Sequence, residues 1–164
     1  MKRQCLVLLV ENNAGVLARI SSLFVQRGFN IDSLTVSPTE VDRLSRITLV
    51  TTGDTKTLNQ IVKQSAKLHE AKLVFPVEEE FSLIREILMV KFSNDNERKD
   101  EIIEIGNSFG AKVIGVTSES FILELAETPQ RIDDFLETLK GYSLIEMCRS
   151  GAIAMERGSV DYDI

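Results

Sequence analysis

The chain has 164 residues, a length that allows one ordinary domain or two small ones. Its 43% hydrophobic and 27% charged residues are close to the average of globular proteins. Its 25 acidic and 19 basic residues give a net charge of −6, which opposes binding to nucleic acid or to an anionic membrane. No apolar run approaches the roughly 20 residues of a membrane span, and the apolar run Cys5–Val10 is too short for a signal peptide. We therefore expect a cytoplasmic protein. Cys5 and Cys148 both lie in apolar runs and are expected to be buried, reduced thiols, and the alternative is a disulfide between them.

The first half of the chain predicts the order strand–helix–strand–strand–helix–strand. Apolar residues recur at spacings of three and four between Val16 and Phe24, which indicates a helix that ends at Gly28. Asp54 opens a second helix, and Pro76 in the last apolar run favours an edge strand. The four expected strands are Cys5–Val10, Ile31–Val36, Arg46–Thr51 and Leu73–Val77.

The second half repeats this order. Asn94 or Asp95 is expected to cap a helix that ends at Gly110. Thr128 and Pro129 form a good cap and first-turn pair for the last helix. The four expected strands are Ile87–Phe92, Val113–Thr117, Phe121–Ala126 and Leu144–Met155.

The offset between matching positions shows where the two halves differ. Leu6 matches Leu88, and Gly28 matches Gly110 at the same offset in numbering. Asp54 matches Thr128 at an offset that is shorter by eight positions, so the first half has eight extra residues between its two helices. We expect them in the hairpin near Ser37–Arg43, as a polar and mobile contact loop.

The repeat predicts an α+β fold of two ferredoxin-like βαββαβ units. We expect these units to span residues 1–79 and 80–164, with the boundary at the charged run Glu78–Glu80. Each unit is small, so packing between sheets or subunits is expected to add buried area.

Candidate catalytic residues are few. The single histidine, His69, is expected at a helix C-terminus, where it interacts with the helix dipole. Asn94–Asn96 resembles the start of a calcium-binding loop, but Lys99 stands where that loop needs glycine. An RNA-binding βαββαβ domain needs exposed aromatic residues on its central strands, and Cys5–Val10 and Arg46–Thr51 have none. We expect no catalytic, metal or cofactor site in this chain.

The segment Glu11–Leu17, between the first strand and the first helix, is the leading candidate for a binding site. Gly15 permits close approach of the backbone to a ligand, and the N–H groups from Gly15 and Val16 onward have no helical partners. Such a helix start suits a carboxylate, while a side-chain carbonyl of Asn12 or Asn13 suits an ammonium group. A zwitterionic α-amino acid satisfies both demands. The alternative is a plain asparagine helix cap followed by a turn glycine.

Asn30 is the second candidate. It lies beside Gly28 at the expected start of the second strand, where its amide offers a donor and an acceptor together. The alternative is a simple helix stop and strand entry. In the second half, Ser93–Arg98 has no glycine and Gly110–Lys112 has no amide, so we expect the first half to bind and the second to assemble.

Three ordered motifs of the first half resemble the regulatory small subunit of acetolactate synthase (acetohydroxyacid synthase). They are Glu11–Leu17, Gly28–Val36 and Leu44–Thr48. Weaker similarity in Arg85–Lys91 and Arg149–Gly151 extends the resemblance over nearly the whole chain.

The resemblance implies an N-terminal ACT domain, which is an amino-acid sensor, in a homodimer whose two ACT domains join their sheets side by side. The effector would lie at that interface. The ligand-contacting positions of the family correspond to Asn12, Gly15 and Val16 of one subunit and to Asn30 and Ile31 of its neighbour.

The resemblance also implies a function in branched-chain amino acid biosynthesis. The chain would be a non-catalytic subunit that activates the catalytic large subunit and confers feedback inhibition by valine, leucine or isoleucine, usually valine. Thiamine diphosphate, FAD and magnesium would be held by the large subunit and not by this chain. Two alternatives stay open: a stand-alone amino-acid sensor that regulates another protein, and an enzymatic activity of the chain itself.

Overall fold

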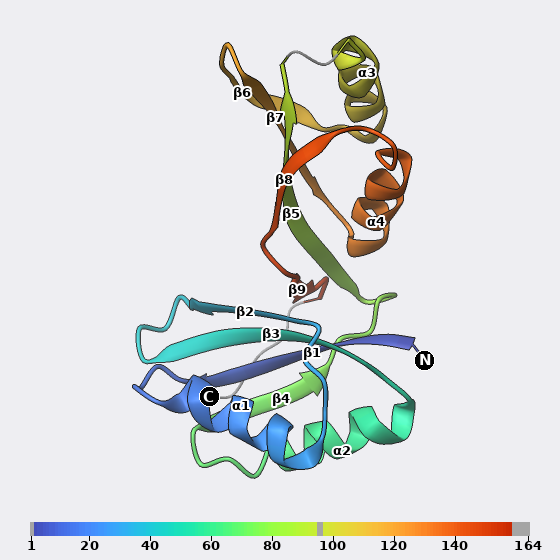
Figure 1. The fold of residues 1–164 in the computed structure, drawn as a ribbon. Helices are drawn as coiled ribbons and strands as arrows, with labels where there is room; N and C mark the ends of the chain where they lie inside the picture. The colour runs from blue at the N-terminus through green and yellow to red at the C-terminus, as the bar shows by residue number, and fades with distance from the viewer. Residues whose placement is uncertain (1, 95–96, 159–164) are drawn as a thin grey trace. The chain divides into compact units, whose positions relative to one another are not determined.

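The computed structural model describes residues 2–94 and 97–158. The chain forms two compact units (Figure 1). The first contains the residues up to Ile84 and the segment that begins at Ala152, and the second is Arg85–Gly151. Among the described residues, no helix combines the length and the apolar character needed to cross a membrane.

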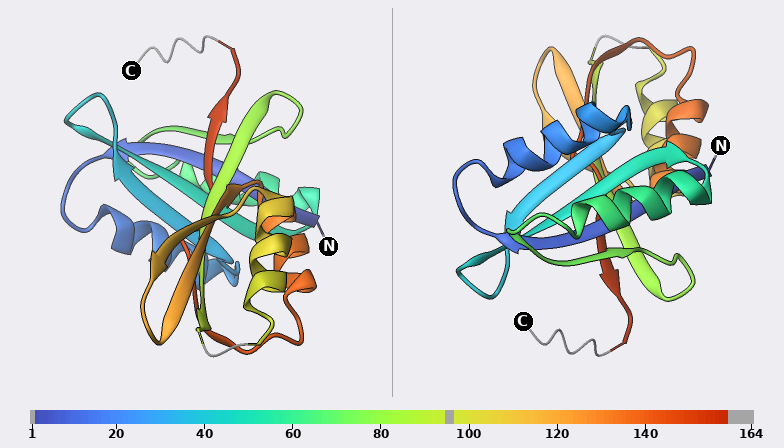
Figure 2. Two further views of the ribbon diagram at one scale, coloured as in Figure 1. Left: turned by 90° about the horizontal axis from the view of Figure 1, so that it is seen from above. Right: turned by 90° about the horizontal axis from the view of Figure 1, so that it is seen from below.

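The first unit is an antiparallel sheet with two helices on one face (Figures 1 and 2). Its strand order is β2-β3-β1-β4, so β2 and β4 are the edge strands. Its elements are β1 (Lys2–Glu11), α1 (Val16–Arg27), β2 (Ser33–Pro38), β3 (Leu44–Gly53), α2 (Thr55–Ser65) and β4 (Ala71–Pro76).

The second unit has the same topology, with strand order β6-β7-β5-β8. Its elements are β5 (Ser82–Ser93), α3 (Lys99–Phe109), β6 (Lys112–Val116), β7 (Ser120–Glu127), α4 (Pro129–Thr138) and β8 (Leu144–Arg149). The two ferredoxin-like βαββαβ units expected from the repeat are therefore confirmed.

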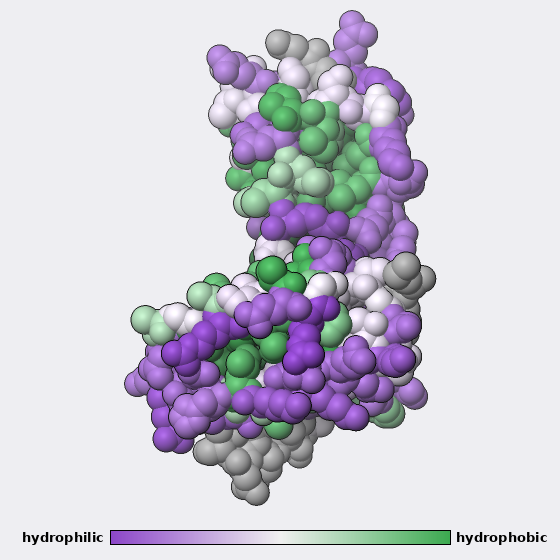
Figure 3. All heavy atoms as spheres, turned by 60° about the horizontal axis from the view of Figure 1, so that its bottom comes forward, coloured by the Kyte–Doolittle hydropathy of each residue, from purple (hydrophilic) through white to green (hydrophobic). Residues whose placement is uncertain are grey.

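The first core lies between the sheet and its two helices. Leu6 and Leu8 of β1 pack against Ile20 and Phe24 of α1 and Ile61 of α2, and each of these side chains is at most 1% exposed. Full burial of such a side chain contributes about 1.5–3 kcal/mol. The outer sides of α1 and α2 are mainly hydrophilic (Figure 3), which orients both helices on the sheet.

The second core is richer in aromatic residues. Phe92 and Phe121 stack with ring centroids 5.5 Å apart. Phe109 of α3 meets Phe135 of α4 at 5.2 Å, in a tilted arrangement. Ile102 of α3 is fully buried among them. Each unit therefore has a hydrophobic core of its own.

Residues expected to bound the elements do so. Gly28 and Gly110 end α1 and α3 in the left-handed conformation, at φ 68° and 85°. The side chains of Asp54 and Thr128 accept hydrogen bonds from the N–H group three residues later, at 2.7 and 3.3 Å. Pro76 lies in the edge strand β4. These expectations are confirmed.

The expected cap of α3 is wrong. The N-cap residue is Arg98, whose side chain makes no capping hydrogen bond. Asn94 lies farther upstream, where its Nδ2 donates to the carbonyl of Thr117 at 2.7 Å and its Oδ1 accepts from Lys99 Nζ at 2.6 Å. Asn94 therefore joins the start of α3 to the β6–β7 hairpin instead, and Asp95 lies outside the described residues.

The single last strand expected over Leu144–Met155 is also wrong. It is divided into β8 and β9 (Ile153–Glu156) by Ser150 and Gly151, the latter at φ 80°. β9 pairs with β5 and belongs to the first compact unit. Nη2 of Arg46 on β3 donates to the carbonyl of Ala154 at 2.8 Å, which ties β9 to the first sheet.

The eight extra residues of the first half are not one loop. The hairpin loop covers residues 39–43 in the first unit and 117–119 in the second, and Ser37 belongs to β2. A larger share precedes β2, where residues 29–32 correspond to residue 111 alone in the second unit. This longer connection carries one of the candidate binding residues, Asn30.

Candidate functional site

The turn between β1 and α1 is built around Gly15. This glycine is the N-cap residue of α1, at φ 87°, a conformation that other residues rarely adopt. No side chain of the turn caps the helix, so the alternative of a plain asparagine cap is wrong. A Cβ atom at Gly15 would meet no atom within 4 Å, which leaves the space beside the turn open.

The N–H groups at the start of α1 are incompletely satisfied. The N–H group of Val16 reaches the carbonyl of Asn13 at 3.4 Å, a long hydrogen bond. Within residues 2–94 and 97–158, the N–H groups of Gly15 and Leu17 find no hydrogen-bond acceptor. The first turn of α1 carries no acidic side chain, so the positive end of the helix dipole is available to a carboxylate.

Backbone hydrogen bonds hold this turn from both sides. The N–H group of Glu11 donates to the carbonyl of Glu70 at 2.9 Å, and that of Asn12 donates to the carbonyl of Arg43 at 2.8 Å. Nδ2 of Asn13 donates to Glu11 Oε2 at 2.9 Å. Asn12 is solvent-exposed, so its amide is accessible to a ligand.

The carboxylate of Glu11 is stabilised in its charged form. Lys72 Nζ lies 2.5 Å from Glu11 Oε1, and this hydrogen bond is the main cause that lowers the pKa of Glu11. The charges of Lys72 and His69 and the hydrogen bond from Asn13 act in the same direction. The expected position of His69 at a helix C-terminus is wrong, because α2 already ends at Ser65 and His69 is exposed in the turn that follows.

Asn30 and Ile31 lie in the connection that precedes β2. Nδ2 of Asn30 donates to Asp32 Oδ1 at 2.6 Å, and the backbone carbonyl of Asn30 accepts from Thr51 Oγ1 at 2.6 Å. The amide of Asn30 is thus oriented, and its Oδ1 is left as an acceptor. Ile31 is half-buried against the first core. Asn30 is exposed and lies outside β2, which begins at Ser33.

The structure brings the predicted site residues together in two separate groups. Asn12, Gly15 and Val16 lie at the N-terminus of α1, and Asn30 and Ile31 lie beyond its C-terminus (Figure 1). Because α1 has 12 residues, the groups are about 18 Å apart along its axis. One subunit therefore cannot offer both groups to a small ligand.

Metal-binding and nucleophilic groups do not add to this site. The described residues contain no group of three or more His, Cys, Asp or Glu side chains placed to hold a metal ion. Both cysteines are free thiols. Burial raises the pKa of Cys5 to about 11. The expected burial of Cys148 is wrong, because this residue lies on β8, where the side chains from Leu144 to Cys148 are exposed.

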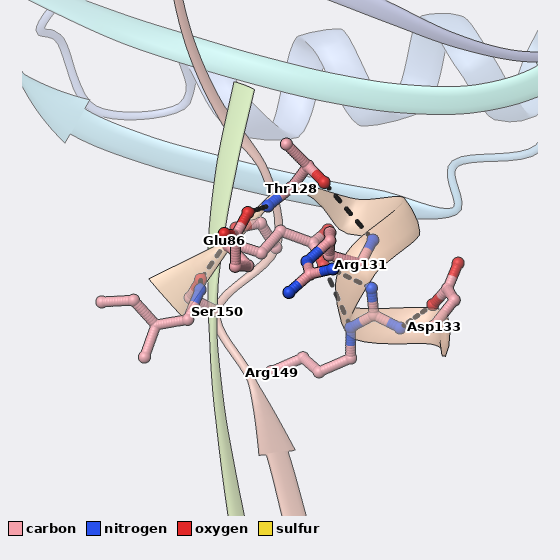
Figure 4. Close-up of polar contacts among 9 residues, drawn as sticks. Glu86, Thr128, Arg131, Asp133, Arg149 and Ser150 are labelled. Carbon is pink, nitrogen blue, oxygen red and sulfur yellow. Dashed lines mark hydrogen bonds and ion pairs between the residues drawn. The ribbon is translucent and has the colours of Figure 1, made fainter. Parts of the chain in front are cut away.

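A polar cluster in the second unit was missed by sequence reasoning. Arg149 binds the buried carboxylate of Glu86 through Nε, at 3.1 Å, and through Nη2, and it binds Asp133 through Nη1 at 2.7 Å (Figure 4). These hydrogen bonds raise the pKa of Arg149 against the opposing effect of burial. Beside them, the Ser150 hydroxyl accepts from the N–H group of Ile87 at 3.0 Å. The motif Arg149–Gly151 was the available signal, but its partners lie far away in the sequence.

Two family models match the chain. Residues 6–71 match the small-subunit-like ACT domain of acetohydroxyacid synthase, and residues 85–158 match the small subunit of acetolactate synthase. The chain belongs to the acetolactate synthase small-subunit family. Its first unit is thus an ACT domain, and its second unit lies in the region matched by the small-subunit model.

Full-length relatives support this membership. The probable acetolactate synthase small subunit of Archaeoglobus fulgidus is 40% identical over 157 residues, which cover 96% of this chain and 98% of the relative. The acetolactate synthase isozyme 3 small subunit of Escherichia coli is 38% identical, with 95% and 96% of the two chains covered. The crystal structure of the acetolactate synthase small subunit from Thermotoga maritima matches with a TM-score of 0.87 at 34% identity, over 98% of this chain and 100% of that one.

Proposed function

We propose that this chain is a non-catalytic subunit that binds and activates the catalytic large subunit of acetolactate synthase and confers feedback inhibition by a branched-chain amino acid. Valine is the first candidate effector. Membership of the small-subunit family supports the large subunit of acetolactate synthase as the partner of this chain. The open helix start at Gly15 supports a ligand with a carboxylate. Thiamine diphosphate, FAD and magnesium are assigned to the large subunit.

The sheet register supports a site shared by two subunits. β2 is an edge strand, available for pairing with a second copy. Pro38 of β2 pairs with Ser45 of β3, and Ser45 also pairs with Val10 of β1. Val10 directly precedes the turn between β1 and α1, so the Pro38 end of β2 lies at the same end of the sheet as that turn. Ser33, at the opposite end of β2, follows closely after Asn30.

Antiparallel pairing of β2 with its twofold mate would set the Ser33 end of one copy beside the Pro38 end of the other. Asn30 and Ile31 of one subunit would then lie at the same end of the joined sheet as Gly15 of the neighbour. Each dimer would hold two such sites. The location of the two half-sites at opposite ends of the first sheet, whose edge strand β2 is available for pairing, is the observation that carries the proposal.

Each part of an amino acid has a partner in this site. The carboxylate would accept from the N–H groups of Gly15 and Val16, the second giving up its long intrachain hydrogen bond. The ammonium group would donate to the side-chain carbonyls of Asn12 and Asn30. Ile31 would supply an apolar wall for a short aliphatic side chain.

We assign effector binding to the N-terminal domain, expected at 1–79, and contact with the large subunit to the C-terminal domain, expected at 80–164. The start of α3 is unsuited to a carboxylate, because Asp100 and Glu101 stand in its first turn. The C-terminal domain also lacks a glycine at the position of Gly15.

Inhibition requires that valine bind one arrangement of the assembly more tightly than the other. A 10- to 100-fold preference corresponds to roughly 1.4–2.7 kcal/mol of coupling. Because coupling is reciprocal, the inhibited large subunit should tighten valine binding by the same factor.

The test is pyruvate condensation by the large subunit, with and without this chain, across valine, leucine and isoleucine. We expect the chain to co-purify with the large subunit, to raise its activity and to make it sensitive to at least one of the three. Unchanged activity of a co-purified complex would contradict the proposal. Binding of valine without any association with the large subunit would favour a stand-alone sensor.

A further inference from the structure

Glu70 is a buried carboxylate beside the turn between β1 and α1, residues Glu11–Val16, which we call the binding turn. It lies in the loop between α2 and β4, and its side chain is only 11% exposed. Nη1 of Arg19, one turn into α1, donates to Glu70 Oε1. The Arg19 side chain is 65% exposed, so the ion pair joins an exposed guanidinium group on the helix surface to a buried carboxylate.

Glu70 also holds the other end of the same turn. Its backbone carbonyl accepts from the N–H group of Glu11 at 2.9 Å. The chain from Glu11 to Arg19 is therefore closed into a ring through one residue, Glu70. Gly15 and the incompletely satisfied N–H groups of α1 lie inside this ring.

The unit that lacks the binding turn also lacks this pair. At the offset in numbering that relates Gly28 to Gly110, the counterpart of Arg19 is Glu101. At the shorter offset that applies after the hairpin, the counterpart of Glu70 is Leu144. Neither the guanidinium nor the buried carboxylate is needed for the shared topology of the two units.

We propose that Arg19 and Glu70 form a clasp that fixes the geometry of the Glu11–Val16 turn and so sets the affinity of the site for an amino acid. Both are positioning residues, because they act on the ligand only through the backbone N–H groups. A turn already held in its binding geometry loses less entropy when the ligand arrives. The identity of the ligand as an amino acid rests on the proposed function. The effect of the clasp on the geometry of the turn can be measured in the absence of any ligand.

The experiment compares the full-length wild-type chain with Arg19→Gln, Glu70→Gln and the double variant. Lys63→Gln is the matched control, since it removes one positive charge from an exposed helix position of the same unit. NMR of the ligand-free chains reports the amide shift and hydrogen exchange of Gly15 and Val16. Calorimetric titration with valine reports affinity, and urea unfolding reports stability.

We expect both single variants to shift the amides of Gly15 and Val16, and to weaken valine binding by roughly threefold to tenfold. The double variant should be no weaker than the singles, because each single change already opens the ring. Arg19→Lys should restore most of the affinity, and Lys63→Gln should match the wild type.

A pair with a purely structural role would lower the unfolding midpoint but leave the Gly15 amide and the valine affinity unchanged, and that result overturns the clasp. If the wild type binds no branched-chain amino acid while Arg19→Gln still shifts the Gly15 amide, the clasp holds and the proposed effector is wrong. Unchanged amides in all variants would refute the clasp whether or not valine binds.

Discussion

Glu86 on β5 and Arg149 at the end of β8 form an ion pair across 63 residues of sequence, with Arg149 Nε 3.1 Å from Glu86 Oε2. Glu86 is 3% exposed, and Asp133 of α4 binds the same guanidinium group at 2.7 Å. One arginine thus joins two strands and a helix of the second unit. The pair gives the buried carboxylate a counter-charge.

Arg149→Gln is expected to destabilise the second unit by about 3 kcal/mol, because it leaves the Glu86 carboxylate buried without its partner. The measurement is the free energy of unfolding in urea. Lys91→Gln is the control, since the Lys91–Glu146 pair lies on an exposed part of the same sheet and should contribute less than about 1 kcal/mol. Equal losses in the two variants would show that Arg149 does not compensate a buried charge.

Gly15→Ala should affect stability and ligand binding differently. The positive φ of Gly15 makes alanine cost about 1–2 kcal/mol, although its Cβ would meet no atom of the chain within 4 Å. That Cβ would project beside the N–H groups, so valine affinity should fall at least about tenfold. Gly110→Ala is the control, at φ 85° and with equally open space.

Calorimetry and urea unfolding on the two glycine variants separate these effects. Both variants should lose similar stability, and only Gly15→Ala should lose valine binding. Normal affinity in Gly15→Ala would exclude the α1 N-terminus as the carboxylate site.

Glu101 should titrate at unusually low pH. Hydrogen bonds from Arg98 and Tyr142 hold the pKa of Glu101 at about 2, below its ordinary value of 4.5. Because the folded-state pKa is depressed, the stability that this carboxylate contributes is present above pH 4.5 and is lost as the pH falls toward 2. Carboxyl NMR should show a midpoint near 2 in the wild type and a higher one in Arg98→Gln. An identical midpoint in the variant would mean that Arg98 is not the cause.

The two thiols should differ in reactivity. Burial raises the pKa of Cys5 to about 11, so almost none of it is thiolate at pH 8, while Cys148 is exposed. Iodoacetamide at pH 8 should label Cys148 in the folded chain and both cysteines in urea, as read by mass spectrometry. Cys148→Ser should remain unlabelled until it unfolds. Rapid labelling of Cys5 in that folded variant would contradict the raised pKa of this half-buried thiol.

Features that depend on neighbouring residues could be predicted from the sequence. Gly28 and Gly110 end their helices and Thr128 begins one, because a helix cap is decided within a single turn of chain. The repeated order of elements then determined the topology of both units. The prediction that Asn94 caps α3 was wrong because its side chain makes its hydrogen bonds with Thr117 and Lys99 instead.

Features that depend on register or on distant partners could not be predicted. Arg149 contacts Glu86 only once β5 and β8 are aligned in the sheet. The single strand predicted over Leu144–Met155 was wrong because its apolar residues continue past the break between β8 and β9 at Ser150 and Gly151. At the candidate site, Gly15 stood out because its conformational freedom is a local property. Glu70 did not, since its contact with the turn depends on how β4 and β1 pair.

The most direct test of the shared site is complementation between two defective dimers. Asn12→Ala and Asn30→Ala each damage both sites of a homodimer, but a mixed dimer has one site with both residues intact. Each homodimer alone should bind valine weakly. After the two are mixed under conditions that exchange subunits, calorimetry should recover about a quarter of the wild-type number of tight sites, since half of the dimers are mixed and each has one intact site. Recovery of no tight sites after proven exchange would show that Asn12 and Asn30 of different subunits do not form one pocket.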